Sequence, residues 1–209
     1  MDGIIFDLDG VICGTDKYHF EAWREVMKKV GIELDESVNT KIRGVSRMVG
    51  LDRILEGSGV DLTAEEKLDL SEEKNTLYVS LLNDMSEADM YPGVKEVLFE
   101  LKRRGIKMAI GSSSKNAKRV LEKIGLGDFF DAVSDGNGIQ RAKPDPEVFL
   151  RAAKMISLEP SKCLVVEDAY TGIDAANSGG FVSVGISDAA KYEKATYTIN
   201  RFEELLALV

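Results

Sequence analysis

The sequence predicts an α/β protein whose core is a doubly wound parallel sheet, with an α-helical domain inserted into it. Three observations lead to this fold class. The run Ile4-Ile5-Phe6 does not alternate with polar residues, which indicates a strand buried on both faces. From about residue 90 onward, short apolar runs alternate with segments of helical spacing, as in a parallel sheet covered by helices on both faces. Residues 15–88 show helical spacing and no strand pattern.

The first predicted strand runs directly into two carboxylates, Asp7 and Asp9, and Gly10 follows them. An unpaired charge at the end of a buried strand is costly, so something must compensate these two anions. A divalent metal or a phosphate-handling site would supply that compensation. The alternative is that the two Asp residues merely open a turn before Gly10. The spacing of the two residues does not decide between these interpretations.

Bulk properties limit the class of protein. The 209 residues are 44% hydrophobic and 30% charged, and they suffice for one large domain or for a core with an insert. A formal net charge of -9 argues against nucleic acid or an anionic membrane as partner, although an anionic substrate needs only a local positive site. There is no apolar run of membrane-spanning length and no signal-peptide layout at the N-terminus. We therefore expect a cytoplasmic protein.

Cysteine and histidine are scarce. Cys13 and Cys163 are far apart in the sequence and form no metal-type pair, which favours a reducing compartment. His19 is the only histidine, so metal sites with several histidines are excluded. A triad with a Ser or Cys nucleophile is possible only through His19.

The predicted insert consists of helices. Apolar positions recur at helical spacing over residues 17–30 and 45–55. Thr63-Ala64-Glu65-Glu66 resembles a helix start, and the segment from there to about residue 85 is predicted to form one or two helices. The candidates for burial in this last segment are Leu68, Leu70, Leu77, Leu81 and Leu82.

The second half alternates strands and helices. The predicted strands cover residues 106–110, 130–133, 163–166, 181–184 and 197–199. The predicted helices cover residues 94–101, 117–124 and 146–156, a segment from 173 to Gly179-Gly180, and a short C-terminal helix with the apolar residues Phe202, Leu205, Leu206 and Val209. Since the first strand needs this sheet to bury it, the core domain is discontinuous. We predict a core of residues 1–13 and 90–209, and a helical cap domain of residues 14–89.

Polar residues follow several predicted strands. In open α/β sheets the ligand lies beyond the carboxyl ends of the strands. Asp7 and Asp9 follow the first strand, and a loop before a helix carries Lys143. Other strands end in Ser112, Ser113 and Ser114 and in Glu167 and Asp168. A nucleophilic carboxylate, carboxylates for Mg²⁺, hydroxyl and N–H groups for phosphate oxygens and a charge-neutralising lysine are the parts that phosphoryl transfer needs.

Each of these groups also has a structural interpretation. Ser112, Ser113 and Ser114 are typical of a helix N-cap, and Lys143 before Pro144 is typical of a solvated loop. Glu167-Asp168 could cap the helix that follows. Their joint occurrence at the strand ends of one sheet favours the site.

Four ordered motifs resemble those of the haloacid dehalogenase superfamily, and the resemblance covers the whole chain. They are Phe6-Asp7-Leu8-Asp9-Gly10-Val11, Gly111-Ser112-Ser113-Ser114, Lys143-Pro144-Asp145-Pro146 and Val166-Glu167-Asp168-Ala169. The second Asp, two residues after the first, resembles the phosphotransferase members. The resemblance implies that Asp7 is a nucleophile that becomes phosphorylated and that Asp9 is a general acid/base. It implies that Ser112 and Lys143 bind the phosphoryl group, and that Asp7, the main-chain carbonyl of Asp9, Glu167 and Asp168 hold Mg²⁺.

The predicted cap is similar to that of the β-phosphoglucomutases within this superfamily. The segments that carry this resemblance are 15–23, 43–47, Lys74-Asn75, 89–93 and 114–117. It implies a hinge at Thr15, a proton-relaying or positioning role for His19 near Asp9, and a sugar contact from Lys74. It also implies a second phosphate site far from Asp7, formed by Arg47 with Ser114, Lys115 and Asn116 beside it. Gly44, Val45, Ser46 and Ser113 are expected to bind substrate as well. A sugar with two phosphates needs such a second site, and a guanidinium grips phosphate bidentately. Without the resemblance, Arg47 would be taken as a helix-capping surface residue and His19 as a helix-surface histidine, while Trp23 is expected in the cap core.

The chain departs from this group at three places. Arg141 lies near the expected site, and it could either point to solvent or add to the distal phosphate grip. Residues 187–196 match nothing recognisable, and Met48-Val49-Gly50 is more apolar than the group predicts.

We therefore predict a Mg²⁺-dependent sugar phosphomutase that interconverts β-D-glucose 1-phosphate and glucose 6-phosphate. It would act through a phospho-aspartate and a bisphosphate, and it would be a monomer whose partner is a small sugar phosphate. The first alternative is a sugar-phosphate phosphatase on the same scaffold. A phospho-accepting signalling domain is disfavoured because it needs no lid, and a dinucleotide-binding domain because the first strand leads to no glycine-rich turn.

Overall fold

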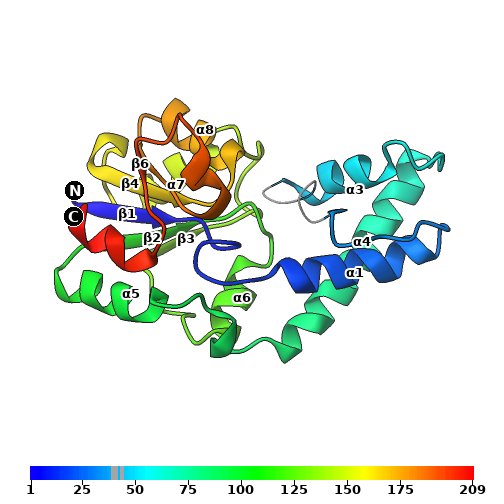
Figure 1. Cartoon of the computed structure of the whole chain (residues 1–209), viewed down its shortest axis with the longest axis horizontal. Helices are drawn as coiled ribbons and strands as arrows, with labels where there is room; N and C mark the ends of the chain where they lie inside the picture. The colour runs from blue at the N-terminus through cyan, green and yellow to red at the C-terminus, as the bar shows by residue number, and fades with distance from the viewer. Residues whose placement is uncertain (39–41, 43–44) are drawn as a thin grey trace.

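One parallel sheet forms the centre of the protein. The computed structural model describes residues 1–38, 42 and 45–209. The six strands lie in the order β3-β2-β1-β4-β5-β6, and each neighbouring pair is parallel (Figure 1). The strands are β1 (Gly3–Phe6), β2 (Lys107–Gly111), β3 (Ala132–Ser134), β4 (Cys163–Glu167), β5 (Val182–Gly185) and β6 (Tyr197–Thr198). The predicted doubly wound parallel sheet is confirmed.

Helices cover both faces of this sheet. Figure 1 shows α5 (Val94–Arg103) and α6 (Ala117–Lys123) on one side, and α7 (Glu147–Met155) and α8 (Tyr170–Ser178) on the other. Along β1, Ile4 and Phe6 pack into the core on the α5 side, whereas Ile5 packs with Phe149 on the α7 side. All four residues of β1 are buried. Two covered faces leave no position for polar residues, which explains the uninterrupted apolar run in the sequence.

The helices that follow β1 pack together beside the sheet (Figure 1). They are α1 (Asp16–Lys28), α3 (Arg47–Leu55) and α4 (Ala64–Leu81), followed by the 3₁₀ turns η1 (Leu82–Asp84) and η2 (Glu87–Asp89). No strand occurs in the described part of 15–88. Trp23 lies at the centre of a separate apolar core with Met27, Leu51 and Ile54, as expected. The start of α4 is a capping box of Thr63 and Glu66, which satisfies two N–H groups at the helix end.

One prediction for α4 was wrong. Leu68 was expected in the core, but it is 52% exposed and lines a cavity between the helical segment and the sheet. The side of α4 that packs on α1 and α3 therefore does not include Leu68. Leu82 is fully buried, and Leu70, Leu77 and Leu81 are half-buried against apolar clusters.

Two chain segments connect the helices to the sheet, and they lie side by side. Cys13 pairs with Met90 in an antiparallel bridge, and the Gly14 N–H donates to the carbonyl of Asp89 at 2.9 Å. The Asp89 carboxylate accepts hydrogen bonds from Lys17 Nζ at 2.5 Å and from the Tyr18 hydroxyl at 3.2 Å. The domain boundaries at 13/14 and 89/90 stay a prediction, and these contacts lie at that junction.

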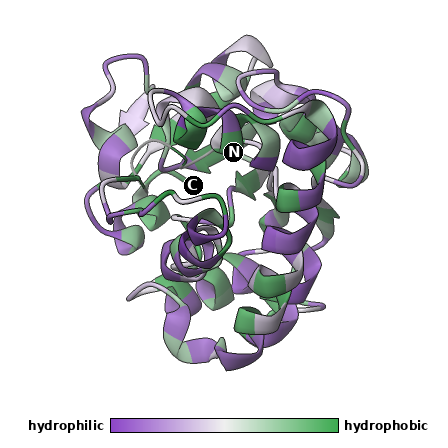
Figure 2. Ribbon diagram, turned by 90° about the vertical axis from the view of Figure 1, so that its right-hand side faces the viewer, coloured by the Kyte–Doolittle hydropathy of each residue, from purple (hydrophilic) through white to green (hydrophobic). Residues whose placement is uncertain are grey.

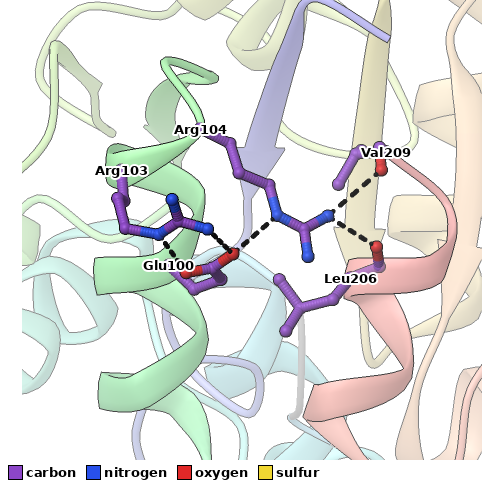
Figure 3. Close-up of polar contacts among 5 residues, drawn as sticks. All are labelled: Glu100, Arg103, Arg104, Leu206 and Val209. Atoms are coloured by element: carbon purple, nitrogen blue, oxygen red, sulfur yellow. Dashed lines mark hydrogen bonds and ion pairs between the residues drawn. The ribbon is translucent and has the colours of Figure 1, made fainter.

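The C-terminal segment packs on α5 as a 3₁₀ helix, η5 (Phe202–Ala207). In a 3₁₀ helix residues three apart share a side, so Phe202 and Leu205 are both buried. Figure 3 shows how Arg104 at the end of α5 fastens this segment. Its Nη1 donates to the main-chain oxygens of Leu206 at 2.9 Å and Val209 at 3.3 Å, while Nε donates to Glu100 at 2.9 Å. The predicted short helix is present, with tighter winding.

Short 3₁₀ turns complete the connections, namely η3 (Pro160–Lys162) before β4 and η4 (Ser187–Lys191) after β5. Hydrophobic and hydrophilic residues alternate along the helices in Figure 2, as expected where each helix buries one side. No helix of the described chain is long and apolar enough to cross a membrane.

The two sides of α5 should respond differently to truncation. Leu98 is fully buried between α5 and the sheet, whereas Phe99 is 54% exposed. We expect Leu98→Ala to lower the free energy of unfolding by about 2–5 kcal/mol through lost burial and a residual cavity. Phe99→Ala should cost less than about 1 kcal/mol. Urea unfolding followed by circular dichroism measures both, and equal losses would contradict the assigned packing.

Candidate active site

The carboxyl ends of β1 and β4 meet in the middle of the sheet. The register pairs Phe6 with Val166, and the Asp7 N–H donates to the Val166 carbonyl at 3.0 Å. Asp7 and Glu167 therefore lie beside each other, and both are buried. Parallel pairing of two central strands brings together acids that lie 160 residues apart in the chain.

Lys143 lies between these two acids. Its Nζ is 2.5 Å from Asp7 Oδ1 and 2.5 Å from Glu167 Oε1, and its side chain is 3% exposed. This placement excludes the solvated-loop interpretation of Lys143. Burial by itself lowers the pKa of Lys143, but the two carboxylates outweigh burial and hold the pKa above its usual range. The lysine is therefore a fixed positive charge.

One lysine does not balance the acids around it. Burial raises the pKa of Asp7 to about 8, against the attraction of Lys143 and with further repulsion from Glu167 and Asp9. Asp168 is also buried here. An ionised Asp7 therefore needs positive charge beyond Lys143.

Asp9 is held by two hydroxyl groups. The Thr15 hydroxyl donates to Asp9 Oδ1 at 2.5 Å, and the Ser112 hydroxyl donates to Oδ2 at 3.4 Å. Burial raises the pKa of Asp9, while the Thr15 hydrogen bond acts in the opposite direction. The two contacts fix the orientation of a carboxyl group that burial favours in its protonated form. A turn of residues 10–12 follows directly after Asp9 and begins with Gly10 at φ 101°.

Gly10 is required at its position for two reasons. Its positive φ is strained for other residues, and a Cβ atom there would lie 2.2 Å from Asp168 Oδ2. The missing side chain lets the Asp168 carboxylate approach the loop after β1. Asp168 thus lies against the loop that carries Asp7 and Asp9, as expected from their positions after the ends of parallel strands.

The serines after β2 are not the cap of the next helix. The N-cap of α6 is Asn116. Ser112 Oγ instead accepts from the Ser114 N–H at 3.1 Å, and it bonds to Asp9 across the loop. Ser113 Oγ is buried without a hydrogen-bond partner among the described residues, and all three serines line the cavity. The N-cap interpretation of Ser112 is therefore excluded.

Glu167 likewise does not form the cap of α8, which is Ala169, but its Oε2 accepts from the Ala169 N–H at 2.9 Å.

The donor set fits a small divalent cation. As they stand, no three His, Cys, Asp or Glu side chains among the described residues form a ready cluster for a metal. Mg²⁺ needs only one or two carboxylates from a protein, because water and phosphate oxygens complete its shell. Of the predicted ligands, Asp7 and Asp168 have buried carboxylates, and the main-chain carbonyl of Asp9 would be the third oxygen. The excess negative charge that raises the pKa of Asp7 is what such a cation would neutralise.

The helical segment supplies basic groups on the opposite wall. Lys74 Nζ lies 2.7 Å from His19 Nδ1, and the His19 ring stacks on Tyr78 with centroids 4.1 Å apart. Burial, together with Lys74 and Arg47, lowers the pKa of His19 well below its usual value. The same burial, with the charge of Arg47, lowers the pKa of Lys74 to about 7. His19 is therefore a neutral base held by a lysine, rather than a solvated helix-surface histidine.

Arg47 begins α3 and is tied to α4. Its Nη1 donates to the Ser71 carbonyl at 3.3 Å, and its Nη2 donates to Asn75 Oδ1 at 2.7 Å. Ser46 is the N-cap of α3, with its hydroxyl accepting from the Val49 N–H at 3.4 Å. Gly44, predicted beside them, lies outside the described residues. Arg47 is half-buried and faces the cavity, so the interpretation as a surface capping residue is excluded.

A single cavity of about 620 Å³ joins these groups. Predicted site residues from both walls line it: Asp7, Asp9, His19, Val45, Ser46, Arg47, Lys74, Ser112, Ser113, Ser114, Lys115, Asn116, Lys143, Glu167 and Asp168. Thr15 does not line it and acts on Asp9. The acids gather at the strand ends, whereas Arg47, Lys115 and Asn116 lie around the α3–α6 side.

The lining also includes residues to which sequence reasoning assigned no role. Asn75, Tyr78, Asn137 and Gln140 contribute to the cavity. Asn75 directly follows Lys74 in a segment already singled out, and that adjacency was the available signal. Asn137 and Gln140 follow β3, so their position after a parallel strand could have identified them.

The structure places residues from each of the three segments in which the sequence departs from the group that it resembles. Arg141 is 71% exposed and pairs with Asp145 and Glu147, so it points to solvent. Met48 lines the cavity together with Leu68 and Ile139, and these three residues form an apolar part of its wall. Within residues 187–196, Tyr192 stacks on Tyr170 at 4.3 Å and bonds to Asp174.

The fold and this strand-end cluster define a member of the haloacid dehalogenase-like hydrolases. The model of that family matches residues 1–180, and the chain belongs to the family. The chain is 36% identical to a β-phosphoglucomutase of Bacillus subtilis, over 98% of this chain and 92% of that relative. It is 33% identical to a phosphorylated carbohydrates phosphatase of Thermotoga maritima, over 86% and 82% of the two chains. The crystal structure of a β-phosphoglucomutase from Clostridium difficile superposes with a TM-score of 0.90 at 40% identity, covering 99% of this chain and 96% of that one.

The buried Lys74 should leave a pH signature in stability. With an ordinary pKa of 10.5 when unfolded and about 7 when folded, the unfolded chain holds the extra proton between these values. The free energy of unfolding of the wild type therefore rises as the pH increases from 7 to 10.5. We expect Lys74→Met to be more stable than the wild type at pH 7 and to lose that advantage by pH 10. Urea unfolding of both proteins across this range tests it, and a difference independent of pH would contradict the lowered pKa of Lys74.

Proposed function

We propose that the protein is a β-phosphoglucomutase, which interconverts β-D-glucose 1-phosphate and glucose 6-phosphate through a bisphosphate. One observation supports the proposal, namely that a single cavity is lined by two groups of residues that could each bind a phosphate. One is the Asp7–Lys143 cluster, and the other is the group of Arg47, Lys115 and Asn116. A substrate with phosphates at both ends requires both places, whereas a phosphatase requires only the first. The similarity to β-phosphoglucomutases over nearly the whole chain supports the same conclusion.

In the proposed reaction Asp7 exchanges a phosphoryl group with the sugar. The Asp7 carboxylate attacks phosphorus, an acyl phosphate forms, and the bond from phosphorus to the sugar oxygen breaks. That oxygen takes a proton from Asp9, whose carboxyl is oriented by Thr15 and Ser112. In the opposite direction Asp9 removes the proton of the attacking sugar hydroxyl. Lys143 and the Ser112 loop hold the transferring oxygens, and the fixed charge of Lys143 stabilises the charge that develops on them.

Mg²⁺ would neutralise charge on the phosphoryl oxygens and keep Asp7 ionised. Asp7, Asp168 and the main-chain carbonyl of Asp9 would hold it. Glu167 stands beside this set, but both of its oxygens already accept hydrogen bonds, from Lys143 and from the Ala169 N–H. We therefore assign Glu167 mainly to positioning Lys143, with any metal contact made through a remaining lone pair.

The helical wall would exclude water while the acyl phosphate exists, because water would hydrolyse it. His19 and Lys74 would contact the sugar hydroxyl groups between the two anion sites. Arg47, Ser114, Lys115 and Asn116, with Val45, Ser46 and Ser113 nearby, would hold the phosphate that is not reacting. After the bisphosphate reverses its orientation in the cavity, its other phosphoryl group would be transferred to Asp7.

The reaction itself is tested by following two products from one substrate. The purified protein is given β-D-glucose 1-phosphate, Mg²⁺ and a catalytic amount of glucose 1,6-bisphosphate. We expect glucose 6-phosphate to form much faster than inorganic phosphate is released. Asp7→Asn should abolish both while its circular dichroism spectrum stays unchanged. Fast phosphate release without isomerisation would overturn the proposal in favour of a sugar-phosphate phosphatase.

Substitution of Arg47 tests the distal phosphate site independently of the site at Asp7. Arg47→Ala removes charged hydrogen bonds to the distal phosphate, and we expect isomerisation to fall about 100-fold. Hydrolysis of p-nitrophenyl phosphate has no distal phosphate and should change by less than about threefold. Equal losses in the two assays would show that Arg47 acts on the fold rather than on a distal phosphate.

A further inference from the structure

Asn75 bridges the two walls of the cavity. Its Oδ1 accepts from Arg47 Nη2 at 2.7 Å and from Asn116 Nδ2 at 2.9 Å. Arg47 belongs to α3 in the helical segment, and Asn116 is the N-cap of α6 beside the sheet. One carboxamide oxygen therefore links a cap helix to a core helix inside the cavity. Two converging donors also determine that Oδ1, and not Nδ2, faces them.

The donors keep hydrogens for a ligand after bonding to Asn75. An arginine carries five N–H groups, and the contacts with Ser71 and Asn75 use two of them. The amide nitrogen of Asn116 has two N–H groups, one of which is used. Asn75 can therefore stay in place when an anion arrives. Its effect is to hold both donors in one orientation before the anion binds, which lowers the ordering cost of binding.

The neutrality of Asn75 is part of this arrangement. Burial lowers the pKa of Arg47, and the charge of Glu72 acts in the opposite direction. An acceptor that carried its own negative charge would pair with Arg47 and repel an incoming phosphate. A carboxamide offers the same acceptor oxygen without that charge.

We propose that Asn75 is a positioning residue that orients Arg47 and Asn116 for the distal phosphate and joins the helical wall to the core across the cavity. This inference rests on the proposed function for the identity of the phosphate ligand. The bridge between α4 and α6 does not depend on it.

The chain supplies a matched control. Asn83 in η1, directly after α4, accepts from Arg119 Nη2 of α6 at 3.3 Å. This bond also joins the α4–η1 segment to α6, but Asn83 does not line the cavity. Asn83→Ala therefore removes an asparagine-mediated bond between the same two parts while leaving the anion sites untouched.

The kinetic test compares three variants. With glucose 1,6-bisphosphate held constant, we expect Asn75→Ala to raise KM for β-D-glucose 1-phosphate about tenfold, with kcat within about threefold. Asn75→Asp should raise KM further, because the carboxylate neutralises Arg47. Asn83→Ala should leave KM unchanged, and p-nitrophenyl phosphate hydrolysis should be the same in all three. Equal effects of Asn75→Ala and Asn83→Ala, or equal losses in both assays, would overturn the proposal.

A second measurement does not depend on the reaction. Fluorescent labels at Glu56→Cys on the helical segment and Lys154→Cys on α7, both exposed, report the distance between the two walls. The native cysteines are buried and leave these positions as the reactive ones. Without ligand, Asn75→Ala should shift the energy transfer towards a wider separation, and Asn83→Ala should shift it less. If the wild type lacks mutase activity, this shift still supports the bridge, whereas an unchanged transfer in Asn75→Ala overturns it.

Discussion

Buried charge at the carboxyl ends of two central strands is the constraint on which the site depends. Asp7 and Glu167 end neighbouring strands, and Lys143 lies 2.5 Å from each of them. None of the three could be buried alone without a large penalty. Together they still leave negative charge in excess, so the pKa of Asp7 is raised to about 8. The cluster is stable enough to be buried and unbalanced enough to attract a cation and a phosphoryl group.

The opposite wall is constrained in another way. Arg47, Lys74 and His19 come from three different helices and meet around one cavity. Burial lowers the pKa of Lys74 and of His19, which limits positive charge near the position proposed for the sugar. Arg47 remains cationic because a guanidinium holds its proton under all ordinary conditions. The cavity thus has acids and Lys143 at one end, weakly charged groups along its side and a permanent cation at the other end.

Much of this arrangement was predictable. A parallel sheet follows from buried strands that carry no polar alternation, and its strand ends must share one edge. That rule predicts, from the sequence alone, that Asp7, Ser112 and Asp168 lie at one place. The predicted burial of Leu68 was wrong because helical spacing identifies an apolar stripe but does not show whether another helix covers it. Arg141 remained open because an arginine beside a site can reach either solvent or ligand, and only its acidic neighbours Asp145 and Glu147 decide.

By itself, the sequence determined the class of fold, the strand-end carboxylates and the position of the helical insert. These depend on local patterns and on the fixed geometry of parallel strands. Only the tertiary structure decided that Lys143 lies between Asp7 and Glu167, that Lys74 bonds to His19, and that Asn75 joins Arg47 to Asn116. Each of these contacts joins residues at least 24 positions apart. Their distances and burial depend on how whole elements pack, and no pattern within one segment contains that information.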